Sequence, residues 1–250
     1  MAQSAKFLYT RLPFLALLFL LSCASPLVKS PDFEFIELSE NMAILADTEA
    51  FVLPYRLQME REMGRVLGES PEEIVRGRGE NALGNLVTDL QASYTAEKMG
   101  LPVDISLMNN GGMRSNLPAG PITLGHIFEL SPFDNYLVIL EGNKAAVEAL
   151  AAFAAERQNI SVSGMEIRSE GGRVREITVG GKALEAGRMY RIAANDYIAN
   201  GGDYMEFLVP LKRVEETSLT LRELLIERIE ARTAQGEAIT AAIENRQVHR

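Results

Sequence analysis

The sequence predicts a folded domain of the α+β class, and three observations support this prediction. Residues 81–99 place apolar side chains at the spacing of one helix face, and residues 103–107 alternate apolar with polar side chains as a strand does. Residues 136–140 form a short, uninterrupted apolar run that is typical of a buried strand. A chain of 250 residues is long enough for one large domain with a substantial core, or for two small domains.

The composition is that of an ordinary folded protein, with 47% hydrophobic and 24% charged residues. The formal net charge is −9, so the chain lacks the basic surface by which proteins bind nucleic acid, and we expect no nucleic-acid partner. An anionic small molecule would therefore have to be bound by a few well-placed arginines.

Residues 1–22 are predicted to be a bacterial lipoprotein signal peptide, because basic residues precede an apolar run over residues 12–21 that is too short to span a membrane comfortably. Leu20-Leu-Ser-Cys23 resembles the lipobox, in which the cysteine is lipidated, and this single cysteine excludes an intramolecular disulfide. An uncleaved anchor or a plain secreted protein is the alternative. We expect a lipid anchor at Cys23 in the bacterial cell envelope, and Ala24 after it favours the outer membrane, facing the periplasm or the cell surface.

A tether over residues 23–44 is predicted to lead into a domain over residues 45–235. The tether contains prolines and acidic residues, and a short strand is predicted over residues 33–36. A helix is expected over residues 47–62, with a capping residue at its start. Pro54 should make this helix start later or bend.

The clearest helix covers residues 81–99 and ends at Gly100, a residue type favoured just after helix C-termini. Arg78 precedes the N-terminus of this helix, where backbone N–H groups already favour an anion. An arginine there would strengthen that preference. Alternatively, Arg78 belongs to a solvated basic loop.

Residues 104–114 are predicted to form a strand that runs into a glycine turn. Asn109-Asn-Gly-Gly112 breaks the strand, because Asn and Gly tolerate the positive φ of tight turns. A Gly-Gly loop lets the backbone approach a ligand closely, and Arg114 offers a planar fork of donors. An ordinary Asn-Gly turn with a solvated arginine is the simpler alternative.

Two further positions place a candidate functional side chain next to a predicted strand. Phe133 directly precedes the strand predicted over residues 136–140, and its ring either plugs the core or lies at the edge of a pocket. The strand over residues 188–194 ends in a second Gly-Gly loop, which carries an aromatic, Tyr197, and a carboxylate, Asp203. This second loop repeats the arrangement of the first.

The remaining elements alternate between helices and short strands. Thr220-Leu-Arg-Glu223 has the spacing of a capping box and starts a helix that ends before Gly236. Residues 236–250 are predicted to be a flexible tail. The other predicted elements are strands over 63–67, 160–162 and 165–168, a helix over 142–157, and a hairpin that follows the strand 174–179 and turns on Gly180-Gly181.

Four blocks of the sequence together resemble the C-terminal, substrate-binding domain of the 5′-nucleotidase family. They are Arg78-x-x-Asn81-x-Leu-Gly84-Asn85-Leu-x-x-Asp89, Asn109-x-Gly-Gly-Met-Arg114, Pro132-Phe133 and Tyr197-x-Ala-x-Gly-Gly-Asp203. The blocks occur in the family's order, and the resemblance spans about residues 45–230, nearly the whole predicted mature chain. The resemblance implies a single α+β domain in which a mixed β-sheet is packed with helices.

The resemblance also implies which residues bind the nucleoside part of a nucleotide. Phe133 and Tyr197 match the two aromatics that sandwich the base, and Asn109 matches a residue whose amide can meet the base edge. Asp203 matches the carboxylate that accepts hydrogen bonds from the ribose hydroxyls. The family often has Phe at the position of Tyr197, a departure that preserves the stacking face.

Arg78 and Arg114 match the arginines that hold the ribose and phosphate end of the nucleotide. Arginine suits a phosphate because its charge is permanent and its donors form a fork. The implied ligand is a nucleotide or a nucleoside.

We expect no catalytic residue, no metal site and no cofactor in this chain. The resemblance implies that full-length members use an N-terminal metallophosphatase domain, in which Asp, His and Asn hold two metal ions. This sequence has two histidines, and it contains neither an Asp-x-His nor an Asn-His pattern to build such a centre. His126 is expected to be structural and His249 to lie in a disordered tail. Divalent metals are expected only in a partner metallophosphatase.

Two functions of different classes follow from these expectations. In the first, the chain is one half of a split 5′-nucleotidase and binds the nucleoside, while a separate metallophosphatase cleaves the phosphate in periplasmic nucleotide catabolism. In the second, it is a non-catalytic nucleotide- or nucleoside-binding lipoprotein for capture or sensing. A surface lipoprotein with a decayed site is a third alternative, which the intact set of pocket residues disfavours.

Overall fold

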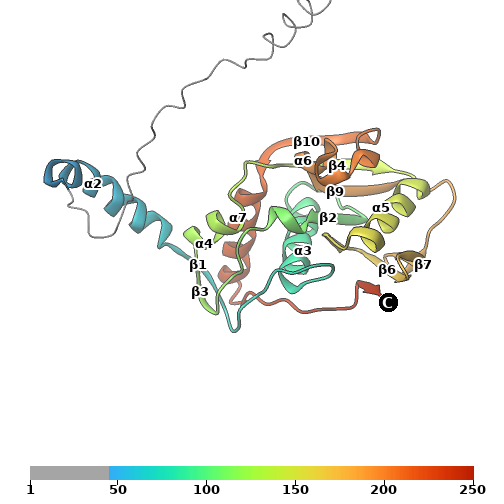
Figure 1. Cartoon of the computed structure of the whole chain (residues 1–250), viewed down its shortest axis with the longest axis horizontal. Helices are drawn as coiled ribbons and strands as arrows, with labels where there is room; N and C mark the ends of the chain where they lie inside the picture. The colour runs from blue at the N-terminus through green and yellow to red at the C-terminus, as the bar shows by residue number, and fades with distance from the viewer. Residues whose placement is uncertain (1–44) are drawn as a thin grey trace, which may run out of the picture. The chain divides into compact units, whose positions relative to one another are not determined.

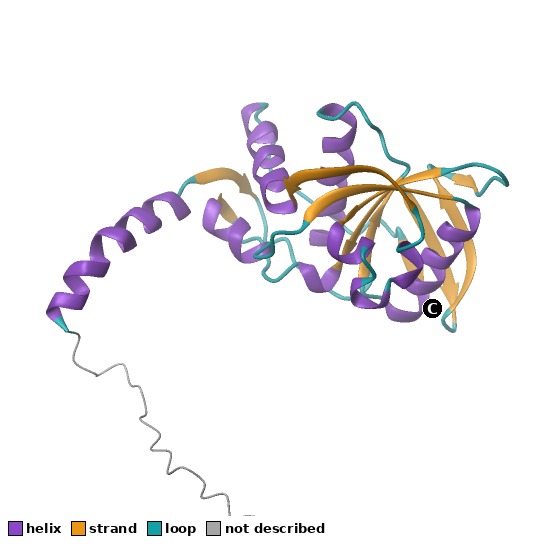
Figure 2. Cartoon of the chain, turned by 90° about the horizontal axis from the view of Figure 1, so that it is seen from above, coloured by secondary structure: helices purple, strands orange, loops and turns teal. Residues whose placement is uncertain are grey.

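Five strands form the central sheet, in the order β10-β4-β9-β2-β5 (Figures 1 and 2). The computed structural model describes residues 45–250, so the predicted signal peptide, Cys23, the tether and its strand over residues 33–36 lie outside the described residues. β2 pairs in parallel with β9 and antiparallel with β5, which confirms the predicted mixed sheet. The strands of this sheet are β2 (Ile105–Asn109), β4 (Tyr136–Gly142), β5 (Ile160–Ser163), β9 (Tyr190–Asn195) and β10 (Lys212–Thr220).

Helices cover both faces of the central sheet, which confirms the predicted α+β class. Leu137 and Ile139 of β4 join the core beneath α3 and α7, whereas Val138 and Leu140 join the core beneath α5 and α6. Successive strand residues point to opposite faces, so one apolar run supplies both layers. The helices are α2 (Ala46–Met63), α3 (Ala82–Glu97), α4 (Leu124–Leu130), α5 (Lys144–Arg157), α6 (Asp196–Ala199) and α7 (Leu221–Ala234), with 3-10 turns η1 (Asn110–Gly112), η2 (Gly202–Tyr204) and η3 (Glu206–Leu208).

Strand β2 is buried along its whole length, in contrast to the single apolar face predicted for residues 103–107. Ser106 is 1% exposed, and its hydroxyl accepts a hydrogen bond from Gln91 Nε2 of α3 at 3.0 Å. Buried polar side chains that have a hydrogen-bond partner give the same alternation of apolar and polar residues in the sequence as exposed polar side chains do. The alternation therefore indicates a strand but does not reveal that both of its faces are covered.

Polar capping residues set the start of the longer helices. Asn81 Oδ1 accepts a hydrogen bond from Gly84 N at 2.8 Å, so α3 begins one residue after the predicted range of 81–99. Thr220 and Glu223 form the predicted capping box of α7. α2 runs from Ala46 through Pro54, so the proline does not delay the start of this helix, and none of its residues is buried. Within residues 45–250 no helix combines the length and the apolar character that crossing a membrane requires.

Two smaller sheets complete the described part of the chain. The hairpin predicted at Gly180-Gly181 is confirmed, since β7 and β8 pair antiparallel on either side of it. One sheet pairs β1 (Val66–Ser70) with β3 (Gly120–Thr123), and the other has the order β11-β6-β7-β8, with β6 (Met165–Glu170), β7 (Arg173–Val179), β8 (Lys182–Ala183) and β11 (Gln247–His249).

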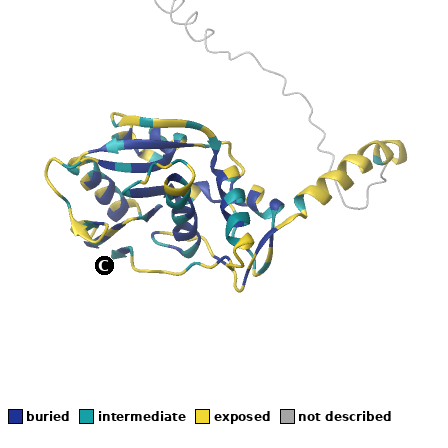
Figure 3. Cartoon of the chain, turned by 180° about the vertical axis from the view of Figure 1, so that it is seen from behind, coloured by how far each residue is buried: buried dark blue, intermediate teal, exposed yellow. Residues whose placement is uncertain are grey.

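The C-terminal residues are anchored to the fold, which corrects the flexible tail predicted for residues 236–250 (Figure 3). Ile239 is fully buried, and Arg246 donates to both carboxylate oxygens of Asp89 at 2.9 and 2.7 Å. Gln247 Nε2 donates to the Ile160 carbonyl at 2.9 Å. These anchors are mostly polar and their partners lie far away in the sequence, so no local apolar pattern indicates them.

His249 belongs to this anchored segment rather than to a disordered tail. Its Nδ1 lies 2.7 Å from Ser169 Oγ, and its Nε2 is buried without a hydrogen-bond partner among the described residues. Burial lowers the pKa of His249 below its ordinary value. The folded state therefore binds this proton less tightly than the unfolded state does.

We expect this histidine to make stability depend on pH below about pH 6.5. The stability is fully present above that pH and is lost as the pH falls toward the lowered folded-state pKa, because the unfolded chain takes up the proton first. Thermal melts of the wild type between about pH 7.5 and 5.5 should show this loss. A His249→Gln variant, which does not titrate, should show a shallower pH dependence, and an identical slope in both proteins would contradict the prediction.

Candidate functional site

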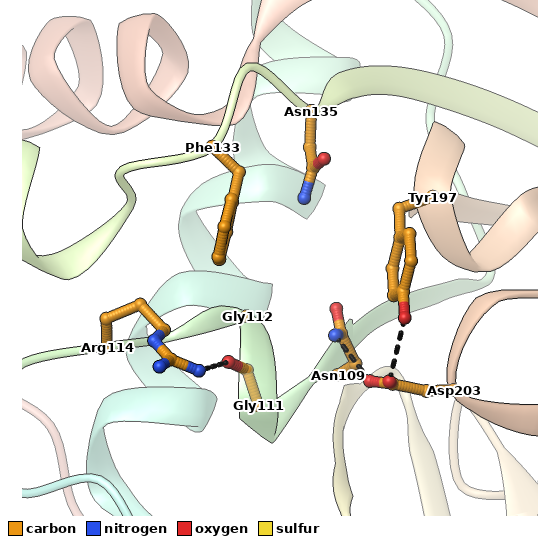
Figure 4. A pocket seen from close by; sticks show the side chains of 8 residues that line it. All are labelled: Asn109, Gly111, Gly112, Arg114, Phe133, Asn135, Tyr197 and Asp203. Atoms are coloured by element: carbon orange, nitrogen blue, oxygen red, sulfur yellow. Dashed lines mark hydrogen bonds between the residues drawn. The ribbon is translucent and has the colours of Figure 1, made fainter. Parts of the chain in front are cut away.

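The two glycine loops of the sequence meet at one edge of the central sheet. β2 and β9 are parallel neighbours, so the loops that follow Asn109 and Asn195 leave the sheet side by side. Together with the segment between α4 and β4 they enclose a cavity of about 330 Å³, called the main cavity below (Figure 4). It is lined by Asn109, Gly111, Gly112, Arg114, Phe133, Asn135, Tyr197 and Asp203.

The two aromatic rings form opposite sides of the main cavity. Figure 4 shows Phe133 and Tyr197 across from each other, with Asn135 between them. The side chains are about half exposed, at 47% for Phe133 and 46% for Tyr197, so neither ring plugs the core. Their open faces are available to a flat ligand.

The Asp203 carboxylate is held from two sides by hydrogen bonds. Asn109 Nδ2 donates to Asp203 Oδ2 at 2.7 Å, and the Tyr197 hydroxyl donates to Asp203 Oδ1 at 3.0 Å (Figure 4). Asn195 Nδ2 in turn donates to Asn109 Oδ1 at 3.0 Å, which fixes the orientation of the Asn109 amide. The hydrogen bond to the carboxylate raises the pKa of Tyr197. The carboxylate is thus positioned before any ligand arrives.

The Gly-Gly pair of the second loop is required by its geometry. Gly201 has a φ of 91°, and a Cβ at Gly202 would lie 2.5 Å from Cζ of the Tyr197 ring. Asp203 itself has a φ of 53°, in the left-handed region. The missing side chain at residue 202 allows the ring to lie against the backbone and reach the next residue's carboxylate.

A Gly202→Ala variant should therefore displace the Tyr197 ring and lower the free energy of unfolding by about 1 kcal/mol, the low end of the cost of overpacking, because the half-exposed ring can turn away. Thermal or denaturant unfolding measures this loss. Gly111→Ala is a matched control from the other loop, because its Cβ would meet nothing closer than Asp203 Oδ2 at 3.7 Å. Equal stability of the two variants would contradict the assignment of Gly202.

Five of the six residues predicted to bind the ligand line the main cavity, and Arg78 does not. Arg114 Nη1 donates to the Gly111 carbonyl at 3.3 Å, and its Cζ lies 6.0 Å from the centre of the Phe133 ring. Arg78 lines a second cavity that shares only Gly111 with the first. The loop that carries Arg78 is fastened to turn η1, where Asn110 Nδ2 donates to the Gly79 carbonyl at 2.9 Å.

Two asparagines of the site were given no role from the sequence. Asn135 lines the main cavity two residues after Phe133, and its place just before the apolar run of β4 is the signal that could have indicated it. Asn195 is 1% exposed and also caps α6 by accepting a hydrogen bond from Ile198 N at 3.0 Å. Asparagine is a preferred residue at helix N-caps. Its place at the end of the strand predicted over residues 188–194 is the signal that could have indicated this role.

The histidines take structural positions. His126 Nδ1 accepts a hydrogen bond from Thr123 N at 3.1 Å and completes a capping box at the start of α4, which confirms the structural role expected for it. Among the described residues, no group of three or more His, Cys, Asp or Glu side chains is arranged to hold a metal ion.

Comparisons with known proteins identify relatives over most of the chain. Residues 64–209 match the family described as 5′-nucleotidase, C-terminal domain. A cell wall protein of Listeria monocytogenes is 30% identical over 188 residues, which cover 68% of this chain and 24% of that protein. The protein UshA of Yersinia enterocolitica is 26% identical over 199 residues, which cover 78% of this chain and 35% of that protein.

A solved structure shares the same fold. The 5′-nucleotidase precursor from Thermus thermophilus superposes with a TM-score of 0.67 at 27% identity, covering 81% of this chain and 43% of that chain. The chain therefore spans less than half of this structure, and between about a quarter and about a third of the two curated relatives. The family match covers more than half of the sequence and includes every residue of the main cavity. The chain belongs to the 5′-nucleotidase C-terminal domain family.

Proposed function

We propose that this chain recognises the nucleoside part of a nucleotide as one half of a split 5′-nucleotidase. A separate metallophosphatase would dock against it and cleave the phosphate in periplasmic nucleotide catabolism. The observation that carries the proposal is a cavity in which Phe133 and Tyr197 stand opposite each other beside the fixed carboxylate of Asp203. This combination suits a flat aromatic base joined to a sugar with two neighbouring hydroxyls.

Stacking would supply much of the affinity. A base held between two rings gains about 1–3 kcal/mol from each stacking contact, as in proteins that bind single-stranded nucleic acid. The half-exposed rings of Phe133 and Tyr197 offer such faces without rearrangement of the core. Asn135 lies between them and can donate or accept at the base edge through its amide.

The Asp203 carboxylate would select a ribose. An ionised carboxylate has about four acceptor sites, and the hydrogen bonds from Asn109 and Tyr197 occupy two of them. The remaining sites can accept from the 2′- and 3′-hydroxyls. Arg114, on the opposite side of Gly111, would then meet the phosphate on the 5′ side of the sugar.

The proposal assigns the chemistry and the divalent metals to the partner metallophosphatase. The family match of this chain is to the C-terminal domain, which supports a role in substrate recognition. Lipid anchoring at Cys23 and an outer-membrane location in the cell envelope belong to the same proposal. The name of the Listeria relative, a cell wall protein, supports an envelope location.

Calorimetric titration of the full chain with adenosine and AMP tests the proposal. We expect dissociation constants of roughly micromolar order, and absence of binding by both ligands would contradict a nucleoside site. A pull-down from the native membrane should then recover a metallophosphatase that hydrolyses AMP when mixed with the chain. Binding without any such partner would instead support the non-catalytic capture or sensing lipoprotein.

A further inference from the structure

A second cavity of about 430 Å³, called the arginine cavity below, borders the main cavity at Gly111. Three arginines line it and no acidic residue does, in a chain whose formal net charge is −9. The described residues that line it are Arg76, Gly77, Arg78, Asn110, Gly111, Arg157, Gln158 and Asn159. Charges of one sign gathered in a hollow create a local potential that attracts ions of the opposite sign, so this cavity favours an anion even though the chain as a whole is acidic.

The walls of the arginine cavity are fixed by hydrogen bonds between three segments. Asn110 Nδ2 donates to the carbonyls of Gly77 and Gly79 at 3.1 and 2.9 Å, which fastens the loop that carries the first two arginines. Gly79 N donates to the Gln158 carbonyl at 2.6 Å, and Asn110 N donates to the Asn159 carbonyl at 2.8 Å. The backbone of the cavity is therefore formed before a ligand binds.

Two of the three guanidinium groups are also held in place. Arg76 Nη1 donates to the Met113 carbonyl at 2.6 Å, and Arg157 Cζ lies 5.1 Å from the centre of the Tyr204 ring. The carboxylate of Glu156 lies 3.9 Å from Arg157 Nε, but both side chains are exposed and a pair this long contributes little. Arginine has five donors, so each group keeps several for an anion.

We propose that the arginine cavity is an anion subsite that binds a phosphoryl group beyond the one met by Arg114. In this assignment Arg157 is a specificity-determining residue that favours nucleotides with more than one phosphate. The inference rests on the proposed function, because the main cavity would hold the nucleoside. Gly111 has no side chain, so a chain of phosphates can pass over it from one cavity to the other. Tyr204 follows Asp203 directly, so one turn presents the ribose acceptor and supports Arg157.

Calorimetric titration of the full chain with adenosine, AMP, ADP and pyrophosphate, in buffer free of divalent metals, tests the inference. The wild type should bind ADP about tenfold more tightly than AMP, as expected for one added hydrogen bond to a charged group. Arg157→Gln should remove this preference and leave adenosine and AMP unchanged. Tyr204→Ala should weaken the preference and Tyr204→Phe, which keeps the ring, should restore it. Arg175→Gln, at an exposed arginine paired with Glu170, is the matched control.

The outcomes separate this inference from the proposed function. Adenosine binding with equal affinity for AMP and ADP would overturn the subsite and leave the nucleoside site standing. An equal effect of Arg157→Gln and Arg175→Gln on ADP would also overturn it, because a general loss of positive charge would then suffice. Binding of pyrophosphate that needs Arg157, in the absence of adenosine binding, would support the subsite and contradict the proposed function.

Discussion

The Asp203→Ala variant is expected to bind adenosine at least about a hundredfold more weakly than the wild type. Each hydrogen bond to a charged acceptor contributes about 1.5–3 kcal/mol, and about 1.4 kcal/mol corresponds to a tenfold change in affinity. Two ribose hydroxyls would donate to this carboxylate, which Asn109 and Tyr197 already hold in place. Calorimetric titration of both proteins under the same conditions measures the loss.

A matched control and a second ligand make this result specific. Glu206→Ala removes the same charge from an exposed position three residues away and should leave adenosine binding unchanged. The wild type should bind 2′-deoxyadenosine about tenfold more weakly than adenosine, since one charged hydrogen bond is lost. The Asp203→Ala variant should bind the two nucleosides equally, and a variant that still prefers adenosine would show that Asp203 does not read the ribose.

Local apolar patterns predict most of the fold, whereas β10 and the C-terminal segment lack such a pattern and are not predicted from the sequence. The periodic helix over residues 81–99 and the apolar run over residues 136–140 correspond to α3 and β4. β10 has mostly exposed and polar residues, because it lies at the edge of the sheet with β4 as its one neighbour in it. The C-terminal anchor depends on the bidentate pair of Arg246 with Asp89, which no local pattern reveals.

The candidate site shows the same limit. Composition and turn chemistry indicate each glycine loop separately, but only the parallel pairing of β2 with β9 places Asn109 beside Asp203. In the sequence, only the family resemblance indicates that the two loops belong to one site. It also grouped Arg78 with the main cavity, whereas the hydrogen bonds of Asn110 hold its loop against the neighbouring cavity.

The Phe133→Ala variant is expected to lose about 5- to 150-fold in affinity for adenosine, since one stacking contact contributes about 1–3 kcal/mol. Its melting temperature should change little, because the Phe133 side chain is 47% exposed and contributes little to the core. Phe128→Ala is the matched control: this ring is 39% exposed and lies 4.5 Å from Arg222 Cζ, and it does not line the main cavity. Affinity and melting temperature are measured on the same preparations.

Variants that keep or remove the ring at Phe133 and at Tyr197 distinguish stacking from simple apolar contact. Phe133→Leu keeps an apolar side chain but no π face, so it should restore little of the affinity that Phe133→Ala loses. Tyr197→Phe keeps the face and removes the hydrogen bond to Asp203, whereas Tyr197→Ala removes both. The alanine variant should therefore bind adenosine more weakly than the phenylalanine variant. Full recovery by Phe133→Leu would mean that the cavity holds an apolar group rather than a base stacked between two rings.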